Sequence, residues 1–344
     1  MKTLKNSLLL LWLLTLISPG ACFANAKETT GSIIFHQKQA EFRPWSSLDL
    51  NQAESLFKAF FSGTSPLQQR SAWQNLGMSV SIQTLANGKT AYLISPGNEA
   101  RQGAGYYLLR PEGLATPGSE SGSMPGSMPG SMPGPMPELM LQAPHQFHDR
   151  HTGHIATQIF TDHPVRALVL NSAHRKRVAN RASLSTNPDL AHNPNTLLMS
   201  FTRGFIAAYP DGKVVQIHGF SASKRKTAAG RRAQIIVSGG ANWPTALSTD
   251  VANCLSERQA EVYLYPRDIN ELGGTTNSIA NWLSSIGKSQ FIHLENSSKM
   301  RENILNNPIV RSLIWSCLSK DSAKVGDSDK PYPTNGRLIP SSDY

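Results

Sequence analysis

Short apolar runs alternate with longer helix-like segments along the second half of the chain. The runs predict strands at residues 138–143, 167–171, 214–218, 234–238, 261–265 and 290–295. Between them, apolar positions at helical spacing predict helices at residues 152–161, 196–209, 245–259, 278–286 and 299–318. The runs are apolar at both alternating positions, which is typical of strands covered on both faces. This pattern predicts an α/β fold, a three-layer α/β/α sandwich with a mostly parallel central sheet.

The first half of the chain carries a weaker version of the same pattern. A helix is predicted at residues 48–61, and strands are predicted at 91–95 and 106–110. A Gly-Ser-Met-Pro repeat follows; it has no periodic apolar face, so we expect residues 118–137 to form a disordered surface insert. These segments predict an N-terminal part of the domain at residues 27–117 and an α/β core at residues 138–320. A flexible C-terminal tail is predicted at residues 321–344.

The first 26 residues have the order of charged, apolar and small residues that is typical of a secretory signal. Lys2 and Lys5 precede an apolar run, and small residues end at Ala26. We therefore expect cleavage near Ala26 and an exported protein, periplasmic or secreted. Cys22 leaves lipidation open as a less favoured alternative, and no later segment is apolar for long enough to span a membrane stably.

Charge and cysteine content add only a little to the prediction of an exported protein. The formal net charge of +10 would fall to +8 on cleavage, because Lys2 and Lys5 are the charged residues of the signal segment. A basic exported protein favours anionic partners, such as acidic peptides or cell-wall polymer. Nucleic acid binding is not expected, since the basic residues are scattered and no aromatic platform lies among them. Cys254 and Cys317 would be the two remaining cysteines, and an oxidising compartment permits a bridge between them.

Polar side chains follow several of the predicted strands, at the point where each strand ends. His145 and Asp149 follow the strand at 138–143, and His218 ends the strand at 214–218. The carboxyl ends of parallel strands meet at one edge of a sheet, where ligands bind in α/β proteins. Two imidazoles and a carboxylate, with a fourth position open, are what a catalytic Zn²⁺ site needs. His148 remains the alternative to Asp149 as the second ligand, and two surface histidines beside a capping aspartate would be the non-functional interpretation.

Other strand ends carry groups that suit acid–base chemistry and substrate binding. Glu295 ends the strand at 290–295 and is the candidate general base; the alternative is a carboxylate in a salt bridge, for instance with Arg301. Arg175 can bind a substrate carboxylate or stabilise an oxyanion, although neighbouring basic residues also suit a solvated loop. Asp189 and His192 are slightly better explained as the cap of the following helix than as partners of a metal ligand. A serine or cysteine nucleophile is not evident.

These residues together resemble the group of zinc carboxypeptidases and N-formylglutamate amidohydrolases, which includes phage poly-γ-glutamate hydrolases. The resemblance covers roughly residues 138–318 and rests on Pro144-His145 with Asp149, on His218-Gly, and on Glu295-Asn-Ser. His145-x-x-x-Asp149 departs from the His-x-x-Glu of carboxypeptidases, and the short spacing to His218 favours the compact amidohydrolase branch. The resemblance implies substrate contacts from the segment that begins at Asn171 and contains His174 and Arg175, and from Asn277.

The sequence therefore predicts an exported Zn²⁺-dependent enzyme that hydrolyses an amide bond in a carboxylate-bearing substrate. Substrates of this class include acidic peptides, cell-wall peptides and γ-glutamyl compounds. The runner-up hypothesis is a non-catalytic exported binding protein that kept the hydrolase fold. The presence of all three candidate ligands together with Glu295 favours the enzyme, because a degenerate relative would more often have lost one of them. Oligomeric state is not predicted.

Overall fold

The structure is a computed structural model that describes residues 40–42, 44–97, 104–111, 136–178, 187–259 and 261–320. The predicted signal segment, residues 118–135 of the predicted insert and the predicted tail from residue 321 lie outside these ranges. None of the helices among the described residues has the length and apolar character needed to cross a membrane.

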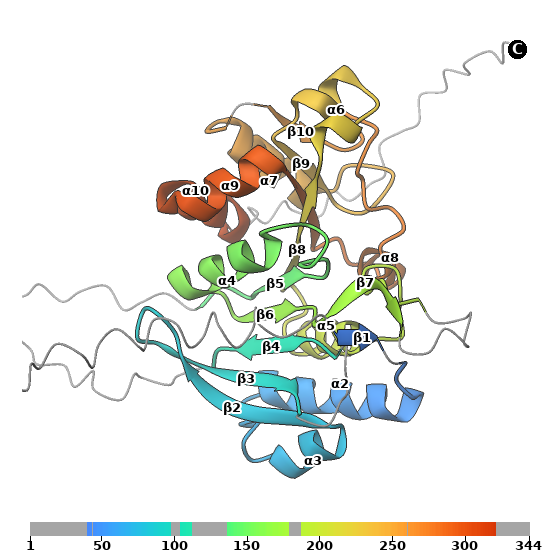
Figure 1. Cartoon of the computed structure of the whole chain (residues 1–344), viewed down its shortest axis with the longest axis vertical. Coiled ribbons are helices and arrows are strands. Elements are labelled where there is room, and N and C mark those ends of the chain that lie inside the picture. Colours follow the sequence, from blue (N-terminus) through green and yellow to red (C-terminus); the bar gives the residue numbers. More distant parts are fainter. Residues whose placement is uncertain are drawn as a thin grey trace, which may run out of the picture.

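A nine-stranded sheet forms the centre of the fold and runs through the whole height of the molecule (Figure 1). In order of pairing, its strands are β10 (Val262–Leu264), β9 (Ile235–Ser238), β11 (Phe291–Ser297), β8 (Lys213–Phe220), β5 (Leu139–Ala143), β6 (Ala167–Leu170), β4 (Tyr106–Leu109), β3 (Thr90–Pro96) and β2 (Met78–Thr84). The central strands β11, β8, β5 and β6 are parallel to one another. Strand β9 is antiparallel to β11, and β4, β3 and β2 form an antiparallel meander beside β6, so the whole sheet is mixed.

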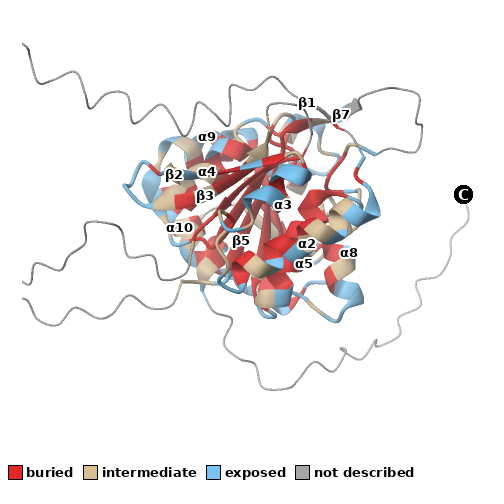
Figure 2. Cartoon of the chain, turned by 90° about the horizontal axis from the view of Figure 1, so that it is seen from below, coloured by how far each residue is buried: buried red, intermediate tan, exposed pale blue. Residues whose placement is uncertain are grey.

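Helices cover both faces of this sheet, which confirms the predicted three-layer sandwich. One face packs against α4 (Thr152–Asp162), α7 (Ala246–Ser256), α9 (Ser298–Asn306) and α10 (Pro308–Ser319). The other packs against α2 (Ser47–Phe61), α3 (Arg70–Asn75), α5 (Leu197–Ala208) and α8 (Ser278–Ser285). Figure 2 shows the buried strands between helices that are exposed only on their outer sides. Apolar side chains that alternate between the two faces of each strand fill both layers of the core.

The predicted helix at 299–318 is wrong in one respect, because the structure has two helices there. Helix α9 ends before Asn307, and α10 begins at Pro308. Proline has no N–H to donate and its ring clashes with the preceding turn, so it is tolerated only at a helix start. The side chain of Asn307 caps α10 by accepting from the N–H groups of Ile309 and Val310. A disulfide between Cys254 and Cys317 then ties α7 to α10.

The remaining elements lie near the carboxyl edge of the central strands. A small parallel pair joins β1 (Ala40–Phe42) to β7 (Ala173–Val178), the strand that follows β6. After β8, the short helices η1 (Ala222–Lys224) and α6 (Ala228–Arg232) form a separate apolar cluster with β9. Strands β1, β2 and β7 and helix α3 were not predicted from the sequence. Strand β2 alternates Met78, Val80 and Ile82 with polar residues, as a half-covered edge strand does.

Candidate metal and active site

His145 and Asp149 are brought together by a tight turn at the end of β5. Pro144 ends the strand, and the N–H groups of His148 and Asp149 both donate to the carbonyl of His145 at 2.8 Å. The turn leads directly into α4 and leaves Nδ1 of His145 3.6 Å from Oδ2 of Asp149. Both side chains are buried, whereas His148 is exposed at the rim of the pocket. The geometry therefore favours Asp149 over His148 as the second candidate ligand.

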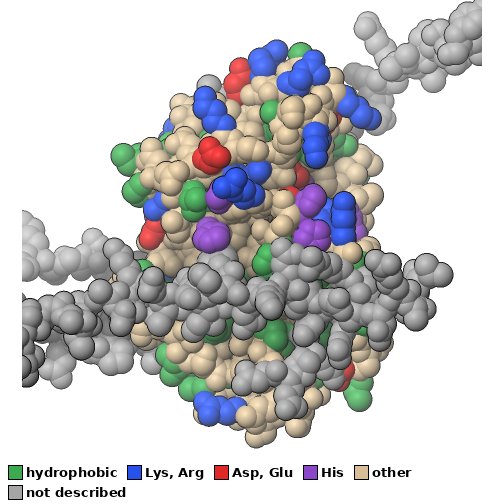
Figure 3. Space-filling view, in the orientation of Figure 1, with side chains coloured by type: hydrophobic (Ala, Val, Ile, Leu, Met, Phe, Trp, Pro, Cys, Tyr) green, Lys and Arg blue, Asp and Glu red, His purple; other side chains and the backbone are tan. Residues whose placement is uncertain are grey.

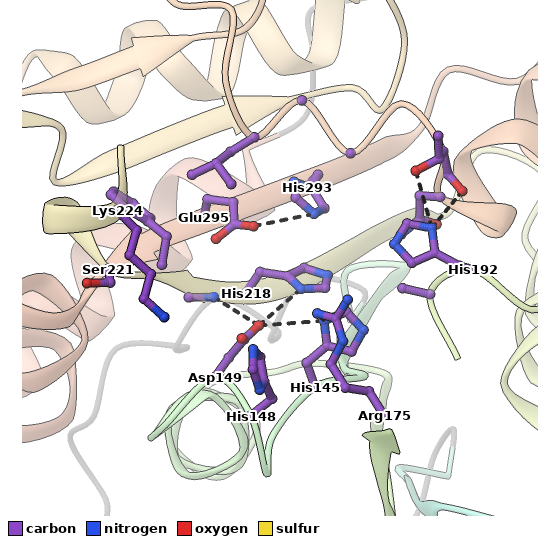
Figure 4. Close-up of a pocket in the computed structure, with 18 of the residues that line it drawn as sticks. His145, His148, Asp149, Arg175, His192, His218, Ser221, Lys224, His293 and Glu295 are labelled. Carbon is purple, nitrogen blue, oxygen red and sulfur yellow. Dashed lines mark hydrogen bonds and ion pairs between the residues drawn. The ribbon is translucent and has the colours of Figure 1, made fainter. Parts of the chain in front are cut away.

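His218 completes this group from the end of β8. Its ring is 3 % exposed, and its Nδ1 lies 3.3 Å from Oδ2 of Asp149. The same carboxylate oxygen accepts from the N–H of Gly219 at 3.2 Å. The absence of a side chain at Gly219 leaves room for Arg301, because a Cβ there would overlap its guanidinium. Figure 4 shows Asp149 between the two imidazoles, with its oxygen directed at both.

A chain of buried amides provides a hydrogen-bond acceptor for one ring nitrogen of His218. Nε2 of His218 lies 3.0 Å from Oε1 of Gln216, which can only accept a hydrogen bond. The amide of Gln216 donates in turn to Gln142 at 2.8 Å, and the amide of Gln142 donates to Thr202 at 2.9 Å. With a metal ion on Nδ1, the nitrogen nearest Asp149, the proton of His218 would be on Nε2 and donated to Gln216. This is the tautomer that a metal ligand needs.

Asp189 provides the corresponding acceptor for Nε2 of His145. Its Oδ1 accepts from Nε2 of His145 at 2.7 Å, while its Oδ2 pairs with Nη2 of Arg175 at 2.7 Å. Nη1 of Arg175 lies 3.3 Å from Nδ1 of His145. Asp189 is thus not the helix cap that the sequence slightly favoured. Helix α5 is capped by Thr196, whose side chain accepts from the N–H of Met199.

Glu295 and His293 face the same pocket from β11. They are two residues apart, so they lie on one face of the strand, and both are buried. Oε1 of Glu295 lies 3.9 Å from Nε2 of His293, while Oε2 has no hydrogen-bond partner in the part of the chain that the structure describes. Arg301 does not provide the salt bridge considered as the alternative; it donates to the backbone carbonyls of Phe220 and Asn296.

The protonation of these groups follows from burial and from their neighbours. Burial, together with the negative charge of Asp149, raises the pKa of Glu295 to about 8. Burial lowers the pKa of His218 to about 4, although the hydrogen bond to Asp149 opposes this shift. Burial alone would raise the pKa of Asp149, but hydrogen bonds from His145 and His218 hold it well below its usual range. Asp149 is therefore a carboxylate and His218 a neutral imidazole at neutral pH, as metal coordination requires.

The pocket around these residues is a cavity of about 590 Å³ with a basic rim. Arg175, Lys224, Arg225 and Arg301 line it, together with the backbone of the loop Gly273–Asn277. Figure 3 shows histidine side chains at the surface next to lysine and arginine side chains in the upper half of the molecule. Such a rim attracts anionic groups toward the cavity.

Of the remaining predicted substrate contacts, Asn171 and His174 lie outside the pocket and Asn277 lines it. Asn171 is buried outside the pocket; its side chain donates to the carbonyl of Pro144 at 2.8 Å and accepts from the N–H of Ala173. His174 does not line the cavity, and its ring faces that of His148. Asn277 lines it but caps α8 and donates to Gln216 at 2.7 Å, so its side chain is already engaged. The predicted contacts from these three side chains therefore have no support in the geometry.

Sequence reasoning assigned no role to His293, although a signal was present. His293 is a polar residue in an apolar strand, two positions before the candidate base Glu295. Side chains two positions apart in a strand lie on the same face. Gln142 and Gln216 carry the same signal, because fully buried amides inside parallel strands need polar partners. The role of Asp189 had no comparable local signal, since its partner His145 is 44 residues away.

The chemistry of the buried groups fits a divalent metal ion. One ligand atom each from His145, Asp149 and His218 lies within 4.8 Å of the others, and a second such group consists of His218, His293 and Glu295. The unpartnered Oε2 of Glu295 and Nδ1 of His293 are also buried beside them, and no described group satisfies either atom. Buried polar atoms without partners are costly, so a cation in this pocket would stabilise the arrangement.

Comparison with known proteins adds little to this geometry. No protein-family model matches the sequence, and no curated protein matches it. Solved structures that align with about half of the chain include the following two. A gene product from Agrobacterium tumefaciens is 12% identical over 53% of this chain and 91% of that chain, with a TM-score of 0.32. N-formylglutamate amidohydrolase from Ralstonia eutropha JMP134 is 10% identical over 54% and 92%, with a TM-score of 0.31. Likeness at this level leaves the function to be argued from the site.

Proposed function

We propose that this protein is an exported, zinc-dependent hydrolase that cleaves an amide bond in a carboxylate-bearing substrate. The observation that carries the proposal is the buried group of His145, Asp149 and His218 in one pocket with Glu295. Oε2 of Glu295 has no hydrogen-bond partner among the described residues. An acceptor beside Nε2 of each histidine supports it further, because it leaves Nδ1 of both rings for the metal. The substrate class is an acidic peptide, a cell-wall peptide or a γ-glutamyl compound, because the rim of the pocket is basic.

His145, Asp149 and His218 would hold the metal through two imidazole nitrogens and one carboxylate oxygen. When bound, zinc would act as a Lewis acid on the scissile carbonyl and would lower the pKa of the attacking water. Three protein ligands leave a further position for water or substrate. Asp189 and Gln216 hold the ligand rings in orientation by accepting from their Nε2 protons.

Glu295 would move the proton during hydrolysis. Its carboxylate would take the proton of the attacking water and pass it to the nitrogen of the leaving amine. A pKa raised to about 8 makes this carboxylate a stronger base than an exposed glutamate and leaves its conjugate acid able to donate. Arg175 would bind the carboxylate of the substrate through its guanidinium, which is partly exposed to the cavity.

Export has separate support. The order of residues at the N-terminus is that of a secretory signal, and the disulfide between Cys254 and Cys317 is of the kind that persists in an oxidising compartment.

The test is metal analysis and activity profiling of the purified protein and three variants. His145→Ala and His218→Ala should lose the bound zinc, and Glu295→Gln should keep one equivalent while hydrolysis falls by about 10²–10⁴-fold. His154→Ala, an exposed histidine on α4, is the matched control and should keep both zinc and activity. Substrates should include γ-glutamyl polymers, peptidoglycan peptides and N-formyl amino acids.

Two results would count against the proposal in different ways. Full retention of zinc by both histidine variants would exclude the proposed ligands. Stoichiometric zinc with ligand binding but no hydrolysis of any of the three substrate classes would instead identify the runner-up, an exported binding protein.

A further inference from the structure

A second cavity adjoins the candidate metal site and has no part in the proposed reaction. It has a volume of about 160 Å³ and is lined by the loop that joins β9 to α7, by α8 and by the first residue of β11. Thr275 lines both cavities, so the two meet at the loop Gly273–Asn277. A ligand held at the metal site can therefore extend into the second cavity if it is long enough.

One strand runs beneath both cavities. Glu295 and His293 line the first, and Phe291, which lies on the same face of β11, lines the second. A strand rises about 3.3 Å per residue, so Phe291 lies roughly 13 Å from Glu295 along the strand. A substrate cleaved beside Glu295 must therefore be a chain of several units, rather than a single amino acid, to occupy both cavities.

The second cavity differs in chemistry from the first. The indole of Trp243 is 59 % exposed, and the side chains of Asn242 and Asn281 line the cavity with it. No acidic residue is among the described residues that line it, and Lys288, which also lines it, is paired with Asp211 at 3.7 Å. An aromatic face among neutral amides suits an uncharged ligand, unlike the anionic group that the basic rim of the first cavity attracts.

A sugar ring matches these groups. The C–H groups on the face of a pyranose pack on an indole, and its hydroxyl groups both donate and accept hydrogen bonds. An asparagine side chain likewise offers a carbonyl oxygen and an NH₂ group, so Asn242 and Asn281 can pair with hydroxyl or acetamido groups in either sense. Neither of these side chains makes a hydrogen bond to another described residue, so both are available to a ligand.

One buried serine holds the walls of the second cavity together. Oγ of Ser238 donates to the carbonyl of Gly273 at 2.6 Å and accepts from the N–H of Gly240 at 2.9 Å, so it links the loops on both sides. Gly240 packs directly on α8, because a Cβ there would overlap that of Ala280, and its φ of +73° is one that glycine adopts without strain. A cavity that is formed before binding loses less entropy when the ligand enters.

We propose that the second cavity is a saccharide subsite, and that the substrate is a cell-wall peptide still joined to its amino sugar. This inference rests on the proposed function and narrows its substrate class. The anionic peptide would lie in the basic cavity with its scissile amide beside Glu295, and the uncharged sugar ring would pack on Trp243. N-formyl amino acids and γ-glutamyl polymers carry no sugar and would leave the second cavity empty.

Binding of the sugar can be measured without any hydrolysis. Chitobiose, the disaccharide of N-acetylglucosamine, is titrated into the purified protein by calorimetry. Trp243→Ala should raise Kd by at least about tenfold, because it removes the aromatic face of the contact, and Trp243→Phe should raise it less. Leu48→Ala is the matched control, since Leu48 is an exposed apolar residue on α2 outside both cavities, and it should bind as wild type does. Near-ultraviolet circular dichroism checks that each variant is folded.

Hydrolysis tests the sugar-linked peptide itself. One cell-wall peptide carries its N-acetylmuramoyl group, and the same peptide with a plain N-acetyl group is the reference. Wild type should have the higher kcat/KM for the sugar-bearing peptide. Trp243→Ala should lower the ratio of the two kcat/KM values by about tenfold, and Leu48→Ala should leave the ratio unchanged.

The possible results separate the subsite from the hydrolase. Failure of folded wild type to bind chitobiose, or equal Kd values for wild type and Trp243→Ala, would overturn the subsite while leaving the hydrolase intact. An equal loss of kcat/KM for both peptides in Trp243→Ala would assign the cavity to the peptide and would overturn the saccharide subsite as well. Chitobiose binding that depends on Trp243, in a protein that hydrolyses none of the substrates, would retain the subsite and reject the hydrolase.

Discussion

Asp189 accepts a hydrogen bond from Nε2 of His145 at 2.7 Å, and this contact leaves only Nδ1 of the histidine for a metal. The other oxygen of the carboxylate holds Arg175, so one aspartate orients both a candidate ligand and a candidate substrate contact. Carboxylates in this position orient the imidazole and raise its basicity.

Replacing this aspartate should weaken metal binding without removing a ligand. Asp189→Asn should lower the affinity for Zn²⁺ by about 10-fold, toward the lower end of what such outer partners contribute. Competition with a chelator of known affinity measures the change. Asp268→Asn, which alters an aspartate paired with Arg267 away from the pocket, is the control and should leave the affinity unchanged. Equal affinities for Asp189→Asn and wild type would mean that His145 is not oriented by this contact.

Arg175 should compete with the metal for His145. Its Nη1 lies 3.3 Å from Nδ1, the nitrogen that the metal needs, and two cations cannot share one lone pair. Arg175→Gln should therefore raise the affinity for Zn²⁺ by about three- to tenfold, and it should raise KM for a carboxylate-bearing substrate. Chelator competition and steady-state kinetics give the two values. A variant with lower zinc affinity than wild type would show that the guanidinium supports the site rather than competing for it.

The metal-free protein should become less stable as pH rises from 6.5 to 8.5. The pKa of Glu295 is raised from 4.5 to about 8 in the folded state, so over this range the folded chain holds a proton that the unfolded chain has lost. The free energy of unfolding therefore falls as pH rises through this window. Hydrogen bonds donated by His145 to Asp149 and Asp189 overcome the effect of burial and raise the pKa of His145, so His145 adds a loss of stability of the same sign above pH 6.5.

Glu295→Gln isolates the contribution of the glutamate. Between pH 6.5 and pH 8.5 the free energy of unfolding of the variant should fall by about 2 kcal/mol less than that of wild type. Urea unfolding in the presence of a chelator, at several pH values, gives the comparison. Parallel pH profiles for the two proteins would contradict the raised pKa.

The disulfide should contribute to stability without affecting the site. It closes a loop with a sequence separation of 63 and joins two helices on the face of the sheet opposite α5 and α8. Changing both Cys254 and Cys317 to serine should lower the free energy of unfolding by about 4 kcal/mol. Zinc stoichiometry should remain that of wild type. Wild type unfolded under reducing conditions is the control and should match the double variant.

The central strands could be predicted because their sequences reflect their surroundings. Strands β5, β6, β8 and β11 are buried on both faces, and their sequences are mainly apolar at both alternating positions. Because they are parallel, their polar ends meet at one edge, as expected for His145, His218 and Glu295. The edge strand β2 was missed, because it is covered on one face only and its apolar positions are spaced by serines.

Contacts between residues far apart in the sequence could not be predicted at the site. Asp189 has a local environment that suits a cap, and only the folded chain brings His145 to it. Asn277 precedes a helix that starts at Ser278, so its capping role could be predicted from the sequence. This capping role explains Asn277 better than the substrate contact suggested for it. The break between α9 and α10 at Pro308 could also have been predicted from the sequence.

Gln142, Gln216 and His293 occupy one row across three adjacent strands, since Gln216 is the register partner of both other residues. A slip of any of these strands by one residue would turn its polar side chain into the apolar layer beneath α4 and α7. The row therefore marks the correct alignment of β5, β8 and β11 while the sheet assembles. Gln142, Gln216 and His293 therefore favour the correct pairing of these strands in addition to lining or supporting the pocket. Substitutions of these residues that are made to alter the chemistry should also increase strand mispairing during folding.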